Sequence, residues 1–344
     1  YGTKEEGFDL FKLSDILNIA VSRKNKKDKN LEDVNYKNPY MLGFPIVASH
    51  KFLKILTDKG FTIPLFDQVT PPPNPKRELT GIYSMGTVID NLCSSESNNI
   101  LSVYVEEEKQ WKTGKCILCI GLSVIDLSIG KSIVHEVYSK NDDDKYSLDE
   151  VIKFINGYNP KEIILYSKKL SSINIDQLIL YLELDNKNYF IINNLSKKFH
   201  KISYQKEILN KIYPTTNHLS SITMLDMERI EYARKSFIIL LNYSYDHNHN
   251  ILDNLEKPLL YSNSKYLHVG NNAIFQLDII NDNKNESNFI FNKNTKFKSL
   301  FEVINKTNTS IGRRYLKELL VNPILDKDEL RYRYNMIENF LKSN

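Results

Sequence analysis

The chain has 344 residues, of which 41% are hydrophobic and 26% are charged, and its formal net charge is +4. This length predicts two or three domains, and so mild a charge does not by itself indicate a nucleic-acid partner. The sequence has no run of about 18 apolar residues, which argues against a membrane-spanning helix, and its three cysteines indicate a reducing compartment rather than a disulfide framework.

The N-terminal segment combines a predicted helix with a basic loop. Residues 6–16 carry apolar side chains at helical spacing, and we expect Phe8 and Phe11 to be buried on that face. A short strand is predicted over 19–21, and the polar, lysine-rich stretch 22–30 follows it. Lysine and arginine in such a loop can contact DNA phosphates, although a charged loop is more commonly a solvated connector.

A Met-x-Gly-x-Pro turn, Met41 to Pro45, precedes a helix that is predicted over 48–59 and ends at Gly60. A strand is predicted over 61–68, and the proline-rich turn after it cannot continue a helix or a central strand. The stretch 77–87 then closes this part of the chain.

The middle of the chain alternates short apolar runs with helical ones. Strands are predicted over 99–106, 116–124, 131–137, 162–166 and 189–192, and helices over 148–156 and 175–184. Strands followed by helix–strand alternation predict an α/β domain of RNase H-like type.

Carboxylates in this middle part raise the alternative of a metal-dependent nuclease, which would hold two metal ions with three or four acidic ligands. The candidates are Asp126, Glu136, Asp149 and Glu150. Their spacing does not form a convincing ligand set, and Asp142 to Asp144 has the pattern of a solvated loop. A scaffold without catalysis is the preferred interpretation.

The cysteines and glycines give no stronger chemical signal. Cys116 and Cys119 lack a second ligand pair for zinc, since only Cys93 remains, and we expect both to be small core side chains. Gly114-Lys115 and Gly130-Lys131 do not belong to a phosphate-binding P-loop. The chain is therefore not predicted to be an enzyme by itself.

From residue 203 the pattern becomes helical. One long helix is predicted over 223–245, with Tyr245 and the residues at helical spacing before it facing inward. The stretch 257–269 is expected to be extended, and the Asn- and Lys-rich stretch 281–296 to be a mobile surface loop.

A helical hairpin is predicted near the end of the chain. Thr309 or Ser310 can cap its first helix, and Pro323 ends that helix. Asp326 can cap the second helix together with Glu329. The inner face of the second helix is predicted to consist of Leu330, Tyr334, Ile337 and Leu341.

The amino-acid sequence of this hairpin resembles that of the lever domain of the MutS mismatch-repair family, in which the pattern is roughly T-x-x-G-x-R-x-L followed by P-(I/L)-x-D. Its positions are occupied by Gly312, Arg314, Leu316, Pro323 and Asp326, after a Leu-Phe-Glu-Val-Ile run at 300–304. Further stretches resemble the same family: Ser22 to Lys24, the turn at 41–45 with its strand to Gln68, residues 77–87 with Met85 in place of proline, and 267–278.

The resemblance implies a multidomain α/β plus α protein. Its parts would be a mismatch-binding head over 1–88 of mixed α+β type, an RNase H-like connector over 89–200, and a long-helix lever domain over 201–344. The family's Phe-x-Glu motif, which inserts a phenylalanine at a mismatch, would end just before Tyr1. We therefore interpret the chain as a fragment of a longer protein.

The resemblance also implies partners and contacts. DNA-contact residues would be Arg23, Lys24, Lys26, Lys27, Met41 and Gly43, and the structural lever motif would be Gly312, Arg314, Leu316 and Pro323. The expected partners are double-stranded DNA with mismatches or small loops, a second MutS-type subunit in a homodimer or heterodimer, and downstream repair factors. No membrane partner is expected, and the protein would be soluble and intracellular.

The expected function is recognition and kinking of mismatched DNA, coupled in the full-length protein to ATP binding and hydrolysis. No cofactor is expected in this chain, whereas ATP and Mg²⁺ are expected in the full-length protein. Two alternatives stay open at this point: a metal-dependent nuclease, and a repair scaffold that does not bind DNA.

Overall fold

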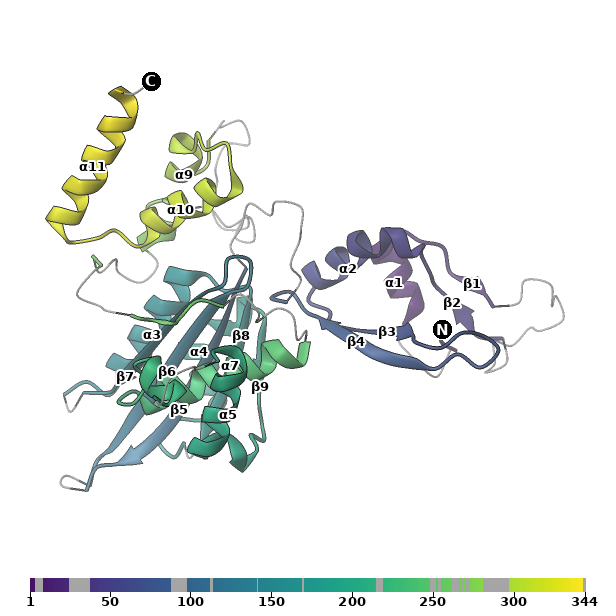
Figure 1. The fold of residues 1–344 in the computed structure, drawn as a ribbon, viewed down its shortest axis with the longest axis horizontal. Helices are drawn as coiled ribbons and strands as arrows, with labels where there is room; N and C mark the ends of the chain where they lie inside the picture. Colours follow the sequence, from purple (N-terminus) through teal and green to yellow (C-terminus); the bar gives the residue numbers. More distant parts are fainter. Residues whose placement is uncertain are drawn as a thin grey trace. The chain divides into compact units, whose positions relative to one another are not determined.

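The computed structural model describes residues 1–3, 9–24, 38–87, 98–111, 114–140, 142–168, 170–214, 219–247, 252, 255–261, 266–267, 269, 273–280 and 297–342 (Figure 1). The chain divides into two compact units, one formed by residues 1–88 with 246–248 and the other by 89–245 with 249–344. Within the described residues, no helix is both long and apolar enough to cross a lipid bilayer.

Unit 1 is small and combines two short antiparallel ribbons with helices. Its elements are α1 (Leu10–Leu17), β1 (Ser22–Arg23), β2 (Tyr40–Met41), the 3₁₀ turn η1 (Ile46–Ala48), α2 (Ser49–Asp58), β3 (Ile63–Gln68) and β4 (Arg77–Tyr83). Asp9 caps α1 by accepting hydrogen bonds from the amides of Phe11 and Lys12, each at 3.1 Å. Leu53 and Leu56 of α2 are buried, and the helix predicted over 48–59 is confirmed to within a residue at each end.

Two predictions for unit 1 are wrong. The strand expected over 19–21 lies at Ser22–Arg23 instead, because these residues pair with Tyr40 and Met41. Phe11 is 55% exposed rather than buried. Its ring meets the ring of Tyr40 edge-on, with 5.2 Å between centroids, so it lies on the ribbon and not in the core. Phe8 lies outside the described residues.

Unit 2 is built on a six-stranded mixed sheet with strand order β10-β7-β6-β5-β8-β9. The strands are β5 (Asn99–Lys109), β6 (Cys116–Asp126), β7 (Lys131–Tyr138), β8 (Glu162–Lys168), β9 (Tyr189–Ile191) and β10 (Leu259–Leu260). The pairs β5–β6 and β6–β7 are antiparallel, whereas β5–β8, β8–β9 and β7–β10 are parallel. The five strands predicted in this region are confirmed to within a few residues.

Helices cover both faces of this sheet, as Figure 1 shows. Alternate residues of β5 point to opposite faces: Ile100 and Tyr104 pack in one cluster, and Leu101, Val103 and Val105 in the other. The second cluster contains α3 (Tyr146–Tyr158) and α4 (Ile175–Tyr181), followed by the 3₁₀ turn η2 (Leu184–Asn186). The first contains α5 (Ile202–Ile212), α6 (Ser221–Met224) and α7 (Glu231–His247), with the turn η3 (Lys197–His200) before α5.

The single helix predicted over 223–245 is wrong, because the chain breaks between α6 and α7. Asp226 has a φ of 57°, a left-handed conformation that ends a helix. The next residue after this left-handed position, Met227, has its side chain fully buried in the core. Tyr245, predicted to face inward, is 37% exposed.

The remaining described helices are α8 (Ala273–Gln276), α9 (Leu300–Ile304), α10 (Ser310–Val321) and α11 (Lys327–Lys342). Phe301, Val321 and Ile280 form a small core, with Leu316 packed against it. Asp326 accepts hydrogen bonds from the amides of Asp328 and Glu329 and so begins α11, as predicted. The inner face predicted for α11 is wrong, because none of the described residues of this helix is buried.

Candidate DNA-contact site and lever motif

The predicted basic segment and the Met-x-Gly-x-Pro turn lie side by side in unit 1. Ser22 is opposite Met41 and Arg23 is opposite Tyr40 in the β1–β2 ribbon. The amide of Lys24 donates to the carbonyl of Pro39 at 3.1 Å, which extends the pairing by one residue. The structure therefore brings Arg23, Lys24 and Met41 together, although they are separated by more than fifteen positions in the sequence.

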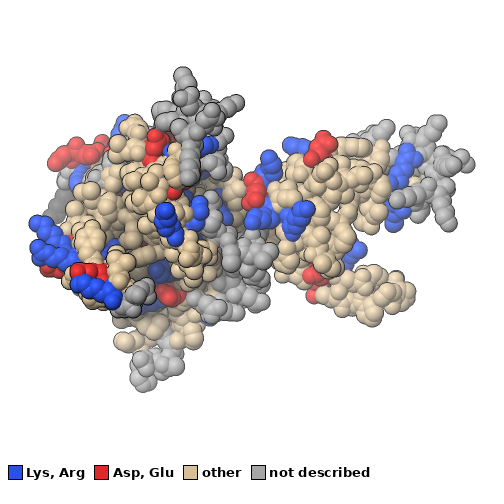
Figure 2. All heavy atoms as spheres, turned by 90° about the horizontal axis from the view of Figure 1, so that it is seen from above, with Lys and Arg blue, Asp and Glu red and all other residues tan. Residues whose placement is uncertain are grey.

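The other residues predicted for this site are less constrained. A methyl group built on Gly43 would meet no atom within 4 Å, so no close approach by a described residue requires a glycine there. Lys26 and Lys27 lie outside the described residues. On the face shown in Figure 2, each unit carries basic side chains with acidic ones among them.

The lever motif is a helix start with a defined geometry. The Thr309 hydroxyl oxygen accepts a hydrogen bond from the amide of Gly312 at 3.1 Å and caps α10, as predicted. A Cβ on residue 312 would lie 3.1 Å from that same oxygen. Because this separation is tighter than an ordinary contact, the glycine leaves room for the cap.

Arg314 of α10 and Asn322, the residue that follows this helix, connect it to the turn after β6 and to α3. Arg314 donates from Nη1 to the hydroxyl of Ser128, which follows β6, at 3.3 Å. Asn322, at the end of α10, donates to the carbonyl of Gly157 in α3 at 3.5 Å. The carbonyl of Pro323 accepts from the amide of Leu267 at 2.7 Å. A mostly apolar cavity of about 210 Å³ lies beside these contacts, with Val124, Ile133 and Val321 in its wall.

The carboxylates considered for a nuclease are engaged in structural contacts. Asp126 accepts from the amide and the hydroxyl of Ser128 in a turn, and Asp149 accepts from the Tyr181 hydroxyl at 2.7 Å. Glu150 pairs with Lys153, and Glu136 accepts from the amides of Tyr232 and Ala233 at the start of α7. In the part of the chain that the structure describes, no group of three or more His, Cys, Asp or Glu residues is placed to hold a metal ion.

The two described cysteines differ in environment. Cys119 is buried in the core of unit 2, as predicted, but Cys116 is exposed, so the prediction is wrong for Cys116. Cys116 is the first residue of β6, and three positions along a strand place its side chain on the face opposite to that of Cys119.

The glycine–lysine pairs of this chain do not fit a nucleotide. Gly114 and Gly130 have φ values of 68° and 75° and precede β6 and β7 in the turns between antiparallel strands. A phosphate-binding loop instead lies between a strand and the N-terminus of a helix. No step through ATP or Mg²⁺ follows from these residues.

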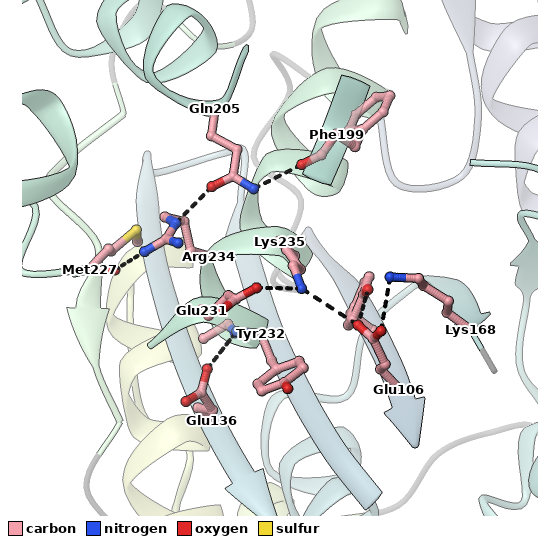
Figure 3. A network of polar contacts seen from close by, with 12 residues as sticks. Glu106, Glu136, Lys168, Phe199, Gln205, Met227, Glu231, Tyr232, Arg234 and Lys235 are labelled. Atoms are coloured by element: carbon pink, nitrogen blue, oxygen red, sulfur yellow. Dashed lines mark hydrogen bonds and ion pairs between the residues drawn. The ribbon is translucent and has the colours of Figure 1, made fainter. Parts of the chain in front are cut away.

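A buried polar network was not foreseen from the sequence (Figure 3). Glu106 on β5 pairs with Lys168 at 2.8 Å and with Lys235 of α7 at 3.5 Å, and Lys235 also pairs with Glu231 at 2.7 Å. Burial raises the pKa of the Glu106 carboxyl, but its contacts with Lys168, Tyr104 and Lys235 outweigh burial and lower that pKa below its ordinary value. The network joins the sheet to the start of α7.

One glycine fixes how closely α7 approaches the sheet. A Cβ on Gly121 of β6 would lie 1.9 Å from the carbonyl oxygen of Tyr232. The only sequence signal for this contact was a glycine inside a predicted strand, which often marks a close backbone approach.

Comparison with known proteins extends these observations. A family model described as MutS domain III matches residues 272–344. A mimivirus protein (Acanthamoeba polyphaga mimivirus) is described as a putative DNA mismatch repair protein mutS homolog. It is 36% identical over an alignment of 370 residues, gaps included, that covers 100% of this chain and 32% of that protein. DNA mismatch repair protein MutS of Caldanaerobacter subterraneus subsp. tengcongensis is 26% identical, over 88% of this chain and 31% of its own length.

The likeness to a solved structure is weaker. T. thermophilus RuvC in complex with Holliday junction substrate has 9% sequence identity and a TM-score of 0.25, over 42% of this chain and 94% of that one. The chain spans about a third of the length of the curated relatives it matches. The match along its whole length and the lever motif agree, and the chain belongs to the MutS family of DNA mismatch-repair proteins.

Proposed function

We propose that the longer protein to which this chain belongs recognises and kinks mismatched duplex DNA, and that unit 1 of this chain contacts the duplex backbone through the β1–β2 ribbon. The observation that carries this proposal is the pairing of Ser22–Arg23 with Tyr40–Met41. It places two cations beside the turn that resembles the family's mismatch-binding domain. Cations on a small ribbon can contact phosphates and position a duplex without reading its sequence.

We also propose the domain assignment that this function requires. A connector of RNase H-like type is supported by the order β7-β6-β5-β8-β9, with the first three strands antiparallel and the last two parallel to β5. The lever domain would begin after α7 rather than at residue 201. The support for this shift is that α5, α6 and α7 share their core with the sheet.

In the longer protein, mismatch binding would be coupled to ATP binding and hydrolysis and to a partner subunit. The support is family membership alone, because the glycine–lysine pairs of this chain do not fit a nucleotide. The contacts of Arg314 with Ser128 and of Asn322 with Gly157 offer a route by which α10 and the sheet would move together.

The experiment is a fluorescence-anisotropy titration of this chain with a fully paired duplex and with the same duplex carrying one mismatch. No Phe-x-Glu sequence occurs in the 344 residues, so we expect weak binding with little preference for the mismatch. Binding should weaken steeply with salt, because phosphate contacts release counterions. Strong mismatch discrimination by this chain would contradict that expectation.

A double variant then tests the ribbon itself. Arg23→Gln with Lys24→Gln should reduce the slope of log affinity against log salt by about 0.9 for each phosphate that the variant no longer neutralises. An Arg77→Gln and Lys76→Gln double variant, in the same unit and with the same change in charge, serves as the control. Equal binding by the two double variants would rule out the ribbon as the contact.

The nuclease alternative has no support in the placement of the carboxylates. It would be revived only by cleavage of nicked or hybrid substrates in magnesium or manganese that Asp126→Asn abolishes. A scaffold that does not bind DNA predicts no salt-sensitive retention of this chain on DNA.

A further inference from the structure

A dense group of exposed lysines lies on η3 and α5 of unit 2. Residues 196–213 contain five lysines and one glutamate. Lys197, Lys198, Lys201 and Lys206, here called the α5 lysine patch, are all exposed. Lys197 and Lys198 lie in η3, Lys201 precedes α5 and Lys206 lies in α5, whose residues Ile208 and Leu209 are buried.

The patch is not neutralised by carboxylates. Lys211 pairs with Glu207 at 3.3 Å, but no described carboxylate lies within ion-pair distance of the four patch lysines. Lys198 instead lies over the ring of Tyr204, with its Nζ 4.8 Å from the centroid. Neighbouring like charges repel one another, and an anionic partner would reduce the repulsion among these four lysines.

A buried glutamine connects η3 and α5, the two elements that bear these lysines, to α7, as Figure 3 shows. Gln205 is 1% exposed, and its Nε2 donates to the carbonyl of Phe199 at 2.8 Å while its Oε1 accepts from Arg234 of α7 at the same distance. Arg234 donates in turn to the carbonyl of Met227 at 2.6 Å. One buried amide therefore ties η3, α5 and α7 together.

Tyr204 adds a second attachment. Its hydroxyl donates to the Asn242 side chain of α7 at 3.2 Å, and its ring meets that of Phe199 edge-on at 5.2 Å. The turn and the helix that bear the lysines thus keep a constant geometry, and only the flexible lysine side chains remain to be ordered on binding. Lysine ammonium groups are compact point charges on flexible side chains. Carried by a fixed backbone, they suit a regular array of phosphates better than bidentate recognition of a single carboxylate.

We propose that the α5 lysine patch is a second contact for the phosphate backbone of duplex DNA, independent of sequence and of mismatch. This inference rests on the proposed function, since it assumes that the protein works on duplex DNA. It assigns to unit 2 a contact that is separate from the β1–β2 ribbon of unit 1.

The test uses the full chain and a fluorescent, fully paired duplex of about two helical turns, titrated at several salt concentrations. The variant replaces Lys197, Lys198, Lys201 and Lys206 with glutamine. Its slope of log affinity against log salt should be smaller by roughly 0.9 for each phosphate left without a lysine. A matched control replaces four other exposed lysines of unit 2 with glutamine: Lys109, Lys115, Lys131 and Lys140. These lie at or near the ends of the strands β5, β6 and β7. Circular dichroism establishes that both variants are folded.

We expect the patch variant to lose affinity for paired and mismatched duplex by the same factor, about tenfold or more at low salt, while the control variant stays within twofold of the parent. Equal isotherms for the patch and control variants would overturn the proposal. An unchanged DNA isotherm together with patch-dependent binding of polyglutamate would also overturn it, in favour of an acidic protein partner.

The ribbon variant separates this inference from the proposed function. Loss of DNA binding in the patch variant but not in the Arg23→Gln, Lys24→Gln variant would support the patch and contradict the ribbon. The reverse result would support the ribbon and overturn the patch.

Discussion

At the scale of single residues, Gly121 sets the distance between the sheet and α7. A Cβ on residue 121 would lie 1.9 Å from the carbonyl oxygen of Tyr232, so only glycine permits this approach. The carbonyl belongs to the backbone of α7 and cannot move aside as a flexible side chain could. We expect Gly121→Ala to lower the free energy of unfolding by about 3 kcal/mol, at the upper end of overpacking costs.

Chemical denaturation followed by circular dichroism measures this change. Gly43→Ala is the control, because nothing lies within 4 Å of its added methyl group, and it should stay within about 0.5 kcal/mol of the parent. A Gly121→Ala protein as stable as the control would show that α7 does not rest on β6 as described.

Glu107 gives a second prediction at this scale, for acidic pH. Burial raises the pKa of its carboxyl, but hydrogen bonds from the amides of Ser171 and Ser172, at 2.6 and 2.9 Å, and from the side chains of Ser171 and Cys116 outweigh burial and lower that pKa to about 2. A depressed pKa in the folded state contributes stability above the unfolded-state value, near 4.3, and this stability is lost as pH falls towards 2.

Glu107→Gln should therefore flatten the loss of stability between about pH 4.5 and pH 2, by up to about 3 kcal/mol. Denaturation midpoints recorded across that range measure the effect. Glu338→Gln removes an exposed partner of Lys342 on α11 and should change the profile little. Parallel profiles for Glu107→Gln and the parent chain would contradict the assignment.

At the scale of an element, the start of α10 depends on one hydroxyl. Thr309→Ala removes the acceptor for the Gly312 amide and should cost about 1 kcal/mol, the usual value of an N-cap. Thr309→Ser retains the oxygen and should cost less than half of that. Hydrogen exchange at the amides of residues 311–313 measures the cap directly, and equal protection in the two variants would argue against it.

Elements whose residues carry their own pattern were predictable from sequence. Buried strands such as Asn99–Lys109 and Lys131–Tyr138 are apolar runs with clear ends, so both were found. The break at Asp226 is not visible in the sequence because helical spacing of apolar residues continues through it, while the left-handed residue precedes a fully buried Met227. The strand at Ser22–Arg23 was missed because its partner is distant in sequence.

In the candidate site, too, features with a local sequence pattern were predictable, and contacts between distant residues were not. A motif with local chemistry, such as the Thr309 cap and the Gly312 contact, follows from the sequence. The Gln205–Arg234 anchor does not, because its two side chains come from different helices and nothing local marks either as buried. The role of Glu136, which accepts from amides at the start of α7, is hidden for the same reason.

At the scale of the whole molecule, α11 presents an apolar stripe to solvent. Tyr334, Ile337 and Leu341 recur at helical spacing and are 64%, 56% and 73% exposed. An apolar stripe of this kind on a helix favours association, because pairing two copies removes apolar surface from water. We expect this chain to self-associate through α11 as its concentration rises into the micromolar range.

Sedimentation velocity over a range of concentrations measures that association. Ile337→Lys with Leu341→Lys should keep the chain monomeric, because a lysine charge on the stripe cannot be buried without a partner. Asn335→Lys with Asn339→Lys adds the same charge to the same helix away from the stripe and should leave self-association nearly intact. If both double variants associate as the parent does, α11 is not the contact, and if both are monomeric, net charge rather than the apolar stripe controls association.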